Sequence, residues 1–193
     1  AKSYGLLPKG RGTLFSQGLQ TFFPKGMERA QMDLIVTHVG ADFDALASLA
    51  AAKKLYPKAS VILPGSTDKD VREYLDKNSH LLELKQEKEV DFKKVKRLIV
   101  VDTRLAKRIG EAKEALNNPG LVLHFYDHHP RAKGDLCGTV DVGGYYGATT
   151  TILVELIKKK KIKISPEEAT LFALGIYEDT GSFTFPSTTP SDL

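Results

Sequence analysis

Short apolar runs alternate with segments of helical periodicity from residue 32 to the end of the chain. The runs have the length and β-branched content of buried strands, and they lie at 33–38 (DLIVTH), 60–63 (SVIL), 97–102 (RLIVVD) and 121–126 (LVLHFY). Apolar residues at helical spacing, or helix start signals, predict helices at 42–56, 68–77, 105–116, 147–161 and 166–179. Strands that alternate with helices in this way predict an α/β fold, a mostly parallel β-sheet with helices on both faces.

Three stretches carry weaker signals. Residues 80–84 (HLLEL) are apolar enough for an edge strand, and the charged stretch at 85–96 is expected at the surface. Residues 1–26 are rich in Gly, Pro and Phe but show neither strand nor helix periodicity. We therefore divide the chain into a basic irregular extension at 1–31 and one α/β domain at 32–193.

The charge balance separates the extension from the domain. The chain carries a net charge of +4, and residues 1–26 hold four basic residues and no acidic ones, so residues 27–193 are balanced. A solvated extension is the favoured interpretation of this tail, and an RNA-binding arm is the alternative. For Lys158–Lys161, which end a predicted helix, a solvated C-terminal turn is likewise favoured over a nucleic-acid patch.

The sequence disfavours membrane, secreted and cysteine-dependent classes of protein. No apolar run approaches the roughly 18 residues of a membrane helix, and the N-terminus lacks the pattern of a signal peptide. We therefore expect a cytoplasmic protein without a membrane partner. Cys137 is the single cysteine, which rules out an internal disulfide and a cysteine-based zinc site.

Acidic and imidazole side chains follow the predicted strands and the last helix. They stand in four stretches: His38 to Asp44, Asp102, Asp127-His128-His129, and Asp179. Carboxyl ends of parallel strands meet at one edge of the sheet, so folding can bring these side chains together. Carboxylate oxygens with a few imidazole nitrogens suit Mn²⁺ or Mg²⁺, and two such ions about 3.5–4 Å apart can clamp a phosphate and activate water. The pattern therefore predicts a two-metal site for phosphoester hydrolysis.

Each residue can be given a place in such a site. Asp102 leaves a central strand, and we expect it to bridge the two ions. Asp42 and Asp44 diverge in an extended loop and can serve different ions. The predicted metal ligands are His38, Asp42 and Asp102 on one ion, and Asp44, Asp102, His128 and Asp179 on the other. The predicted catalytic residues are Asp102 as the bridge, His129 as a hydrogen-bond donor facing the substrate, and Asp127 as the acceptor that orients a histidine.

Each of these residues alone has a plainer explanation. An Asp after a strand often caps the next helix, which Asp102 could do, and adjacent histidines are often surface residues. The presence of the whole set at strand ends favours the metal site. His80 is interpreted as a surface residue and His124 as a packed residue of its strand, and both are left outside the site.

These stretches closely resemble the motifs of the DHH phosphoesterase superfamily, which is named for the triplet that stands here as Asp127-His128-His129. The resemblance spans residues 33 to 190. The segments 41–48 (ADFDALAS), 64–66 (PGS) and 126–130 (YDHHP) are most similar to the DHH domain that precedes CBS domains and a tRNA nucleotidyltransferase or poly(A) polymerase domain in certain bacterial proteins. The resemblance implies a Mn²⁺- or Mg²⁺-dependent hydrolase with the same ligands.

The resemblance also sets the expected partners and substrates. In the family a smaller substrate-binding domain of the DHHA1 type follows, so we interpret the chain as part of a longer RNA-processing protein that also has DHHA1-type, CBS and nucleotidyltransferase domains. The expected substrates are RNA ends, short oligonucleotides or nucleotides, and a homodimer is left open. A nucleotide-sensing regulatory module is the alternative function. Inorganic pyrophosphatase is a third and weaker interpretation, because no pattern of Lys and Arg points to pyrophosphate.

Overall fold

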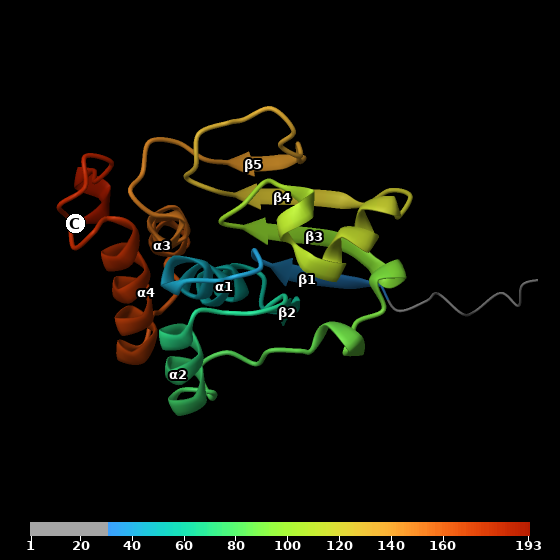
Figure 1. Cartoon of the computed structure of the whole chain (residues 1–193), viewed down its shortest axis with the longest axis horizontal. Helices are drawn as coiled ribbons and strands as arrows, with labels where there is room; N and C mark the ends of the chain where they lie inside the picture. The colour runs from blue at the N-terminus through green and yellow to red at the C-terminus, as the bar shows by residue number, and fades with distance from the viewer. Residues whose placement is uncertain (1–30) are drawn as a thin grey trace, which may run out of the picture.

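The fold is built on one parallel sheet of five strands in the order β2-β1-β3-β4-β5 (Figure 1). The computed structural model describes residues 31–193, so the predicted extension at 1–31 lies outside the described residues except for Gln31. The strands are β1 Met32–Val36, β2 Ser60–Ile62, β3 Val95–Val101, β4 Val122–Tyr126 and β5 Val140–Val142. Every pair of neighbouring strands is parallel, which confirms the predicted α/β class.

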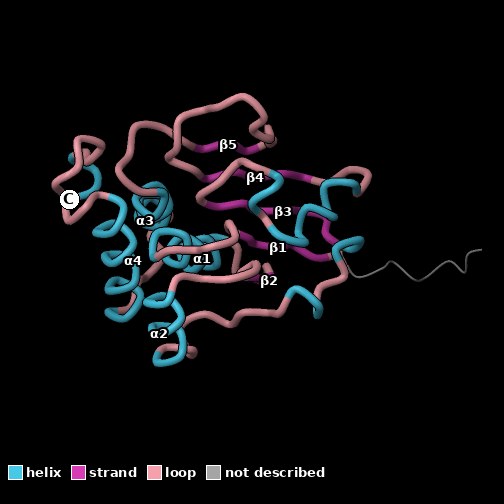
Figure 2. Tube along the Cα trace, in the orientation of Figure 1, coloured by secondary structure: helices cyan, strands magenta, loops and turns pink. Residues whose placement is uncertain are grey.

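Within residues 31–193, four α-helices accompany the sheet, and short 3₁₀ turns fill other connections (Figure 2). The α-helices are α1 Phe43–Leu55, α2 Lys69–Lys77, α3 Thr149–Lys159 and α4 Pro166–Asp179. The 3₁₀ turns are η1 Glu87–Glu89, η2 Phe92–Lys94, η3 Ala106–Arg108, η4 Gly110–Asn117 and η5 Pro190–Asp192. The predicted helices other than 105–116 are therefore confirmed. Among residues 31–193, no helix combines the length and hydropathy that crossing a membrane requires.

The strand order reverses between β1 and β3. The chain moves from β1 outward to β2 on one side, and then adds β3, β4 and β5 on the other side. In open parallel sheets, the loops at such a reversal diverge at the carboxyl ends of the strands and leave room for a ligand. The loops after β1, β3 and β4 are therefore the places where a site is expected.

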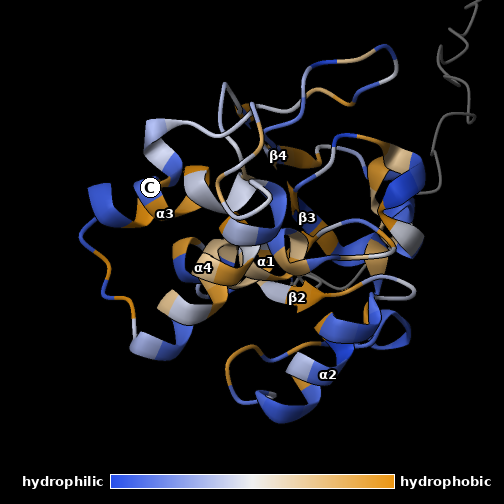
Figure 3. Cartoon of the chain, turned by 60° about the vertical axis from the view of Figure 1, so that its left-hand side comes forward, coloured by the Kyte–Doolittle hydropathy of each residue, from blue (hydrophilic) through white to orange (hydrophobic). Residues whose placement is uncertain are grey.

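One face of the sheet is covered by α1 and α3, and α4 packs against these two helices. The stretch from Asp44 to Ala52 is buried without interruption, because α1 is enclosed by the sheet, α3 and α4. A Cβ at Gly175 of α4 would lie 2.8 Å from the Ala47 Cβ, so the two helices meet where both side chains are small. Only Val71 of α2 is buried, and Figure 3 shows α2 mostly in hydrophilic colours.

The other face is covered by 3₁₀ turns, and the helix predicted at 105–116 is wrong. Gly110 has a φ of 58°, and Glu87 Oε1 accepts the Glu111 backbone N–H at 2.9 Å, so a side chain satisfies a group that an α-helix would bond internally. Ile109, Ala112 and Ala115 are fully buried. Their spacing of three residues matches the 3₁₀ repeat, which packs one face of a short helix onto the sheet.

The edge strand predicted at 80–84 is also wrong. The chain touches the sheet edge at one point, where Lys85 forms a single bridge with Ile62 and its N–H bonds to the Val61 carbonyl at 2.8 Å. The helix start at Ser165 is confirmed, because its Oγ accepts from the Glu168 N–H at 3.2 Å and Glu168 bonds back at 2.7 Å. Local capping chemistry was therefore easier to predict than strand pairing.

Candidate metal centre

The centre lies where β1, β3 and β4 end. His38 follows β1 by two residues, Asp102 follows β3 directly, and Asp127 follows β4 directly. Asp102 is 2% exposed and has a φ of 60°. This left-handed conformation is uncommon outside glycine, although Asp adopts it more readily than most residues. It turns the chain sharply at the end of β3, so the carboxylate stands at the carboxyl edge of the sheet.

A first group of donors consists of His38, Asp42 and Asp102, whose ligand atoms lie within 4.8 Å of one another. His38 Nδ1 is 3.1 Å from the Val39 carbonyl oxygen. Since a carbonyl can only accept, this bond places the proton on Nδ1 and leaves Nε2 facing Asp102 Oδ2 at 3.2 Å. Asp42 Oδ1 also accepts the Ala45 N–H at 2.9 Å as the N-cap of α1.

A second group consists of Asp44, Asp102, His128 and Asp179. His128 Nδ1 lies 3.1 Å from the Tyr146 carbonyl oxygen, so its proton is on Nδ1 and Nε2 points inward. Nε2 lies 3.0 Å from Asp179 Oδ2 and 3.9 Å from Asp102 Oδ1. This buried nitrogen nevertheless makes no hydrogen bond within residues 31–193. An imidazole that donates through Nδ1 to a backbone carbonyl while Nε2 faces carboxylates has the arrangement typical of a metal-ligating histidine.

The amino end of α3 holds two carboxylates of this group, which the sequence did not predict. Asp44 accepts the backbone N–H groups of Thr149 at 2.8 Å and of Thr150 at 2.9 Å. The Thr149 hydroxyl donates to Asp102 Oδ1 at 2.8 Å. These bonds fix carboxylates that carry further lone pairs for a cation. The signal for these contacts in the sequence is the Thr149-Thr150-Thr151 run at the start of the predicted helix.

His129 stands apart from the buried ligands. Its side chain is half exposed, and Nδ1 lies 2.7 Å from Asp127 Oδ1, which leaves Nε2 without a partner in the described part of the chain. Asp102, His128 and His129 also form a third group of close donor atoms, since His129 Nδ1 is 3.7 Å from Asp102 Oδ1. The histidine that bonds to Asp127 is thus His129, whereas His128 bonds to the Tyr146 carbonyl instead.

Arg104 is a buried charge that the sequence prediction missed. Its guanidinium pairs with Asp127 Oδ2 at 2.8 Å and donates to the carbonyl oxygens of Asp127 at 3.0 Å and of His129 at 3.3 Å. It also lies 3.3 Å from Asp141 Oδ1 of β5. Arg104 therefore ties the loop that carries the two histidines to the neighbouring strand.

Residues 34–176 match the family described as "DHH family, N-terminal domain". The chain belongs to the DHH family. This confirms the resemblance that the Asp127-His128-His129 triplet and the flanking stretches suggested.

Two curated relatives of this DHH domain are A-adding tRNA nucleotidyltransferases. The protein from Geobacter sulfurreducens is 44% identical over 162 residues, which cover 83% of this chain and 18% of that protein. The protein from Aquifex aeolicus is 36% identical over 159 residues, which cover 82% of this chain and 18% of that protein. The chain thus spans a small part of the length of the relatives it matches, as predicted for a DHH domain of longer proteins.

A solved structure shares the fold. The crystal structure of an exopolyphosphatase-related protein from Bacteroides fragilis superposes with a TM-score of 0.66 at 25% identity. The match covers 84% of this chain and 50% of that chain. The fold of this DHH domain is therefore similar to that of about half of the exopolyphosphatase-related protein.

The second ligand group of the DHH domain brings the carboxylates of Asp44, Asp102 and Asp179 together, and their negative charges repel one another. Burial raises the pKa of Asp44 well above its usual range, and the charges of Asp102 and Asp179 add to the effect. Burial also raises the pKa of Asp42. Burial by itself lowers the pKa of His128, but the Asp179 carboxylate, 3.0 Å from Nε2, and the charges of Asp44 and Asp102 raise it to about 9. The centre therefore favours bound positive charge, either protons or a cation.

The pKa values of the other two histidines of the centre, His38 and His129, are also raised by neighbouring carboxylates. Burial lowers the pKa of His38, yet the hydrogen bond with Asp102, the charge of Asp102 and the bond to the Val39 carbonyl together raise it. The hydrogen bond with Asp127 raises the pKa of His129. Burial opposes ionisation of Asp127, but its bonds from His129 and the charge of Arg104 hold the pKa of this carboxyl below its usual value.

The donor set of the DHH domain fits divalent cations. Carboxylate oxygens dominate, two imidazole Nε2 atoms face them, and each imidazole is fixed through Nδ1 by a backbone carbonyl. Oxygen ligands with a few nitrogens suit Mn²⁺ and Mg²⁺. A histidine that binds metal through one ring nitrogen usually donates through the other to a carbonyl or carboxylate. Asp102 belongs to all three groups, so it is the residue best placed to serve two ions.

Metal binding to the DHH domain should weaken as the pH falls from about 9 to 6.5. Because the pKa of His128 rises from 6.5 to about 9 on folding, this group stabilises the metal-free protein fully below pH 6.5, and that contribution is lost as the pH rises through 9. A cation competes with the same proton. Thermal unfolding with Mn²⁺ or with EDTA should therefore show a larger Mn²⁺-induced rise in Tm near pH 9 than near pH 6.5. An equal rise at both pH values would contradict this assignment, and a His128→Gln variant should lose most of the pH dependence.

Proposed function

We propose that this DHH domain is a divalent-metal-dependent phosphoesterase that acts on RNA ends, short oligonucleotides or nucleotides. The observation that carries the proposal is that Asp102 belongs both to the group with His38 and Asp42 and to the group with Asp44, His128 and Asp179, at the carboxyl edge of the sheet. The proposed cofactor is a pair of Mn²⁺ or Mg²⁺ ions. Such ions supply polarisation of the phosphoryl oxygens and a lowered pKa for water.

The protein's own residues are assigned to holding these ions and the substrate. His38 and Asp42 would hold one ion, and Asp44, His128 and Asp179 would hold the other, with Asp102 as a ligand available to both. Thr149 and Thr150 keep the carboxylates of Asp102 and Asp44 in place. Because these partners are rigid backbone and buried hydroxyl groups, the ligands are already arranged before substrate binds.

His129 is assigned to the substrate rather than to metal binding. Asp127 accepts from Nδ1 and raises the pKa of the imidazole, which favours a protonated Nε2 on this half-exposed side chain. From there it can donate a hydrogen bond to a phosphate oxygen or protonate the departing oxygen. Asp127 acts through His129 by fixing its ring.

Replacing His129 with Ala should lower kcat by about 10²–10⁴-fold, the usual contribution of a positioned proton donor. Mn²⁺ affinity should stay close to that of the wild type, because the proposed ligands are untouched. Steady-state kinetics and calorimetric titration of Mn²⁺ measure the two effects separately. His80→Ala is the matched control, since His80 is exposed and lies outside the ligand groups. Loss of Mn²⁺ binding in His129→Ala would make this residue a ligand instead.

The proposal is tested with a panel of substrates in Mn²⁺: a short RNA, a dinucleotide, 3′-phosphoadenosine 5′-phosphate and pyrophosphate. Turnover that EDTA abolishes, on one of the first three, supports the phosphoesterase and names its substrate class. Turnover of pyrophosphate alone would favour the inorganic pyrophosphatase instead. Mn²⁺ binding with no turnover of any substrate would overturn the phosphoesterase.

A regulatory module is the second candidate. The observation that favours it is that the A-adding tRNA nucleotidyltransferases are far longer than this chain, which covers 18% of each. In such a protein a nucleotide bound at the metal centre could report to other domains without being cleaved. A nucleotide that binds only with Mn²⁺, and that is recovered intact, would identify this function.

A further inference from the structure

A cluster of exposed lysines lies where α3 ends, far from the metal centre. We call the five residues the basic turn: Lys158, Lys159, Lys160, Lys161 and Lys163. Lys158 and Lys159 belong to the last turn of α3, where positive charge is favoured by the carbonyl end of a helix. Lys161 and Lys163 lie beyond the helix, so stabilisation of the helix end does not explain them.

Lys161 occupies a position at which a lysine is unfavourable. Its φ is 56°, and the chain around it closes with two bonds, from the Ile162 N–H to the Ile157 carbonyl at 3.1 Å and from the Lys161 N–H to the Lys158 carbonyl at 2.9 Å. This pair of bonds defines a Schellman helix end, and the residue with positive φ in that motif is usually glycine. A side chain there opposes folding. The stability of the helix end therefore does not explain a lysine at this position.

The lysines of the basic turn form no ion pair with an acid of residues 31–193. The lysine ion pairs found between residues 31 and 193 involve Lys54, Lys69 and Lys94 instead. Five positive charges that lie close together and face solvent repel one another. A bound polyanion relieves this repulsion and releases its own counterions.

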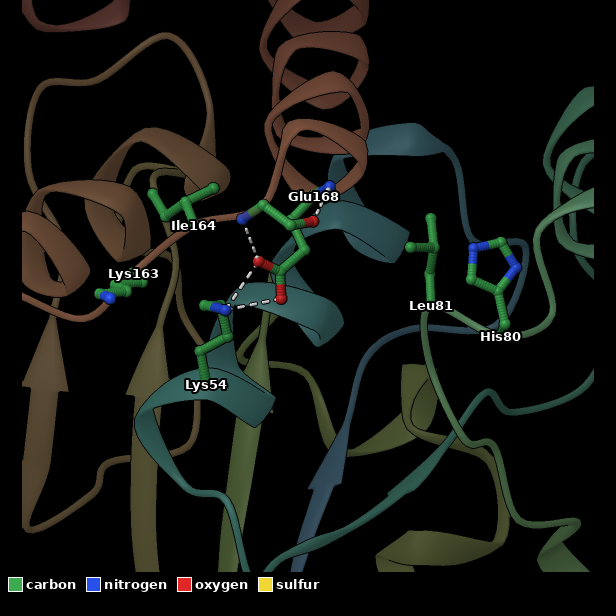
Figure 4. Close-up of a pocket in the computed structure, with 7 residues that line it drawn as sticks. Lys54, His80, Leu81, Lys163, Ile164 and Glu168 are labelled. Carbon is green, nitrogen blue, oxygen red and sulfur yellow. Dashed lines mark hydrogen bonds and ion pairs between the residues drawn. The ribbon is translucent and has the colours of Figure 1, made fainter.

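A pocket of about 530 Å³ opens beside Lys163 (Figure 4). In Figure 4, Lys163 and Ile164 lie on one side of it and His80 and Leu81 on the other, with Lys54 and Glu168 between them. Both Glu168 oxygens bind Lys54 Nζ, at 2.6 and 2.7 Å, so this pair satisfies itself. Lys163 and His80 remain for a ligand, beside the apolar side chains of Leu81 and Ile164. A volume of this size suits one nucleotide unit.

We propose that the basic turn and this pocket bind the backbone of an RNA strand, apart from the metal centre. Taking RNA as the polyanion rests on the proposed function. Asp44 and Asp102 bind the amino end of α3 and the basic turn lies at its carboxyl end, and 11 helical residues span about 16 Å. A strand that reaches both places needs several nucleotides, whereas a dinucleotide can occupy only one. The surface therefore gives the domain a preference for longer RNA.

The first test compares two variants with the same change in net charge. One replaces Lys158, Lys159, Lys160 and Lys163 with Gln, and the control replaces four exposed lysines from the opposite face of the sheet, Lys88, Lys93, Lys96 and Lys113. The probe is a fluorescein-labelled oligouridylate of about 12 nucleotides, which is within the usual range of single-strand sites. Fluorescence anisotropy is measured over a salt series with the metal chelated.

The basic-turn variant should bind about tenfold or more weakly, with the slope of log K against log salt reduced by about 3, because each lost phosphate contact to a single strand contributes about 0.7. The control should change affinity less than about twofold. Equal losses in the two variants would attribute binding to net charge and overturn the proposal. Failure of the wild-type protein to bind the oligouridylate would also overturn it.

Lys161→Gly separates binding from folding. The substitution should raise Tm by about 1–4 °C, because glycine relieves the positive φ. It should also weaken RNA binding about threefold at low salt, because one phosphate contact is lost. A higher Tm with unchanged RNA affinity would make Lys161 irrelevant to the ligand and count against the proposal.

Turnover distinguishes this surface from the proposed function. If both are right, the four-lysine variant should hydrolyse a dinucleotide at the wild-type rate in Mn²⁺ but show a raised KM for the longer oligouridylate. If the wild-type protein binds oligouridylate through the basic turn but hydrolyses neither the dinucleotide nor the oligouridylate, the proposed function is wrong and the RNA-binding surface is supported. Equal KM values for the variant and the wild type on the longer substrate would overturn the surface alone.

Discussion

Replacing Asp102 with Asn should remove divalent-metal binding and lower phosphoester hydrolysis by about 10³-fold or more. Asp102 belongs to all three groups of ligand atoms and is 2% exposed. Asn tolerates the φ of 60° nearly as well as Asp, and its amide oxygen can still accept from the Thr149 hydroxyl. The substitution therefore removes the charge with little change in shape. Calorimetric titration of Mn²⁺ and steady-state kinetics on the best substrate measure the two losses.

Asp179→Asn is the matched comparison, because Asp179 belongs to one ligand group only. It should lose one of two bound ions and keep the site formed by His38, Asp42 and Asp102.

The free energy of unfolding of Asp102→Asn, measured in EDTA, tests whether unfolding causes the loss of activity. Since the charge of Asp102 contributes to the raised pKa of Asp44, removing it relieves repulsion, and the free energy of unfolding in EDTA should stay equal or rise. Wild-type Mn²⁺ binding by Asp102→Asn would refute the shared site.

Features that depend on neighbours in sequence could be predicted from the sequence. The alternation of strands and helices gave the parallel sheet, and Ser165 with Glu168 gave the start of α4, because capping needs only residues three apart. The placement of His38, Asp102 and Asp127 at strand ends followed from the same alternation, since parallel strands put their carboxyl ends at one edge. Which residues bind metal stays a prediction.

Features that depend on distant contacts could not be predicted. Asp44 binds the amino end of α3 across 105 residues, and Arg104 meets Asp141 across 37, so neither contact is visible in a local pattern. The predicted helix at 105–116 failed for a different reason. The sequence contains the three-residue spacing of Ile109, Ala112 and Ala115, but this spacing is so close to the helical period that it does not distinguish a 3₁₀ helix from an α-helix.

Arg104 could not be predicted from the sequence as a site residue, yet it pairs with Asp127, which could. Its sequence position, two residues after Asp102, gives no hint of its partners, yet it is among the few charged residues of the described chain that are almost fully buried. It neutralises Asp127, and Asp127 in turn fixes the ring of His129. Asp141, its second partner, also pairs with the exposed Arg131. The position of the histidine loop therefore depends on a buried pair of opposite charges.

Arg104→Leu should lower the free energy of unfolding by about 3–5 kcal/mol, the usual cost of leaving a buried charge without its partner. The Arg104 and Asp127 side chains are each 3% exposed and 2.8 Å apart, so the carboxylate of Asp127 cannot regain water when the guanidinium is removed. Arg97→Leu is the matched control: Arg97 pairs with Asp33 at 3.0 Å, but the two side chains are 40% and 31% exposed, so the loss should stay within about 1 kcal/mol. Urea unfolding of the two variants measures the difference. Adding Asp127→Asn to Arg104→Leu should recover part of the stability, because the unpaired charge is then gone. Equal losses in Arg104→Leu and Arg97→Leu would show that burial does not strengthen this pair, and His129 would then need another explanation for its fixed ring.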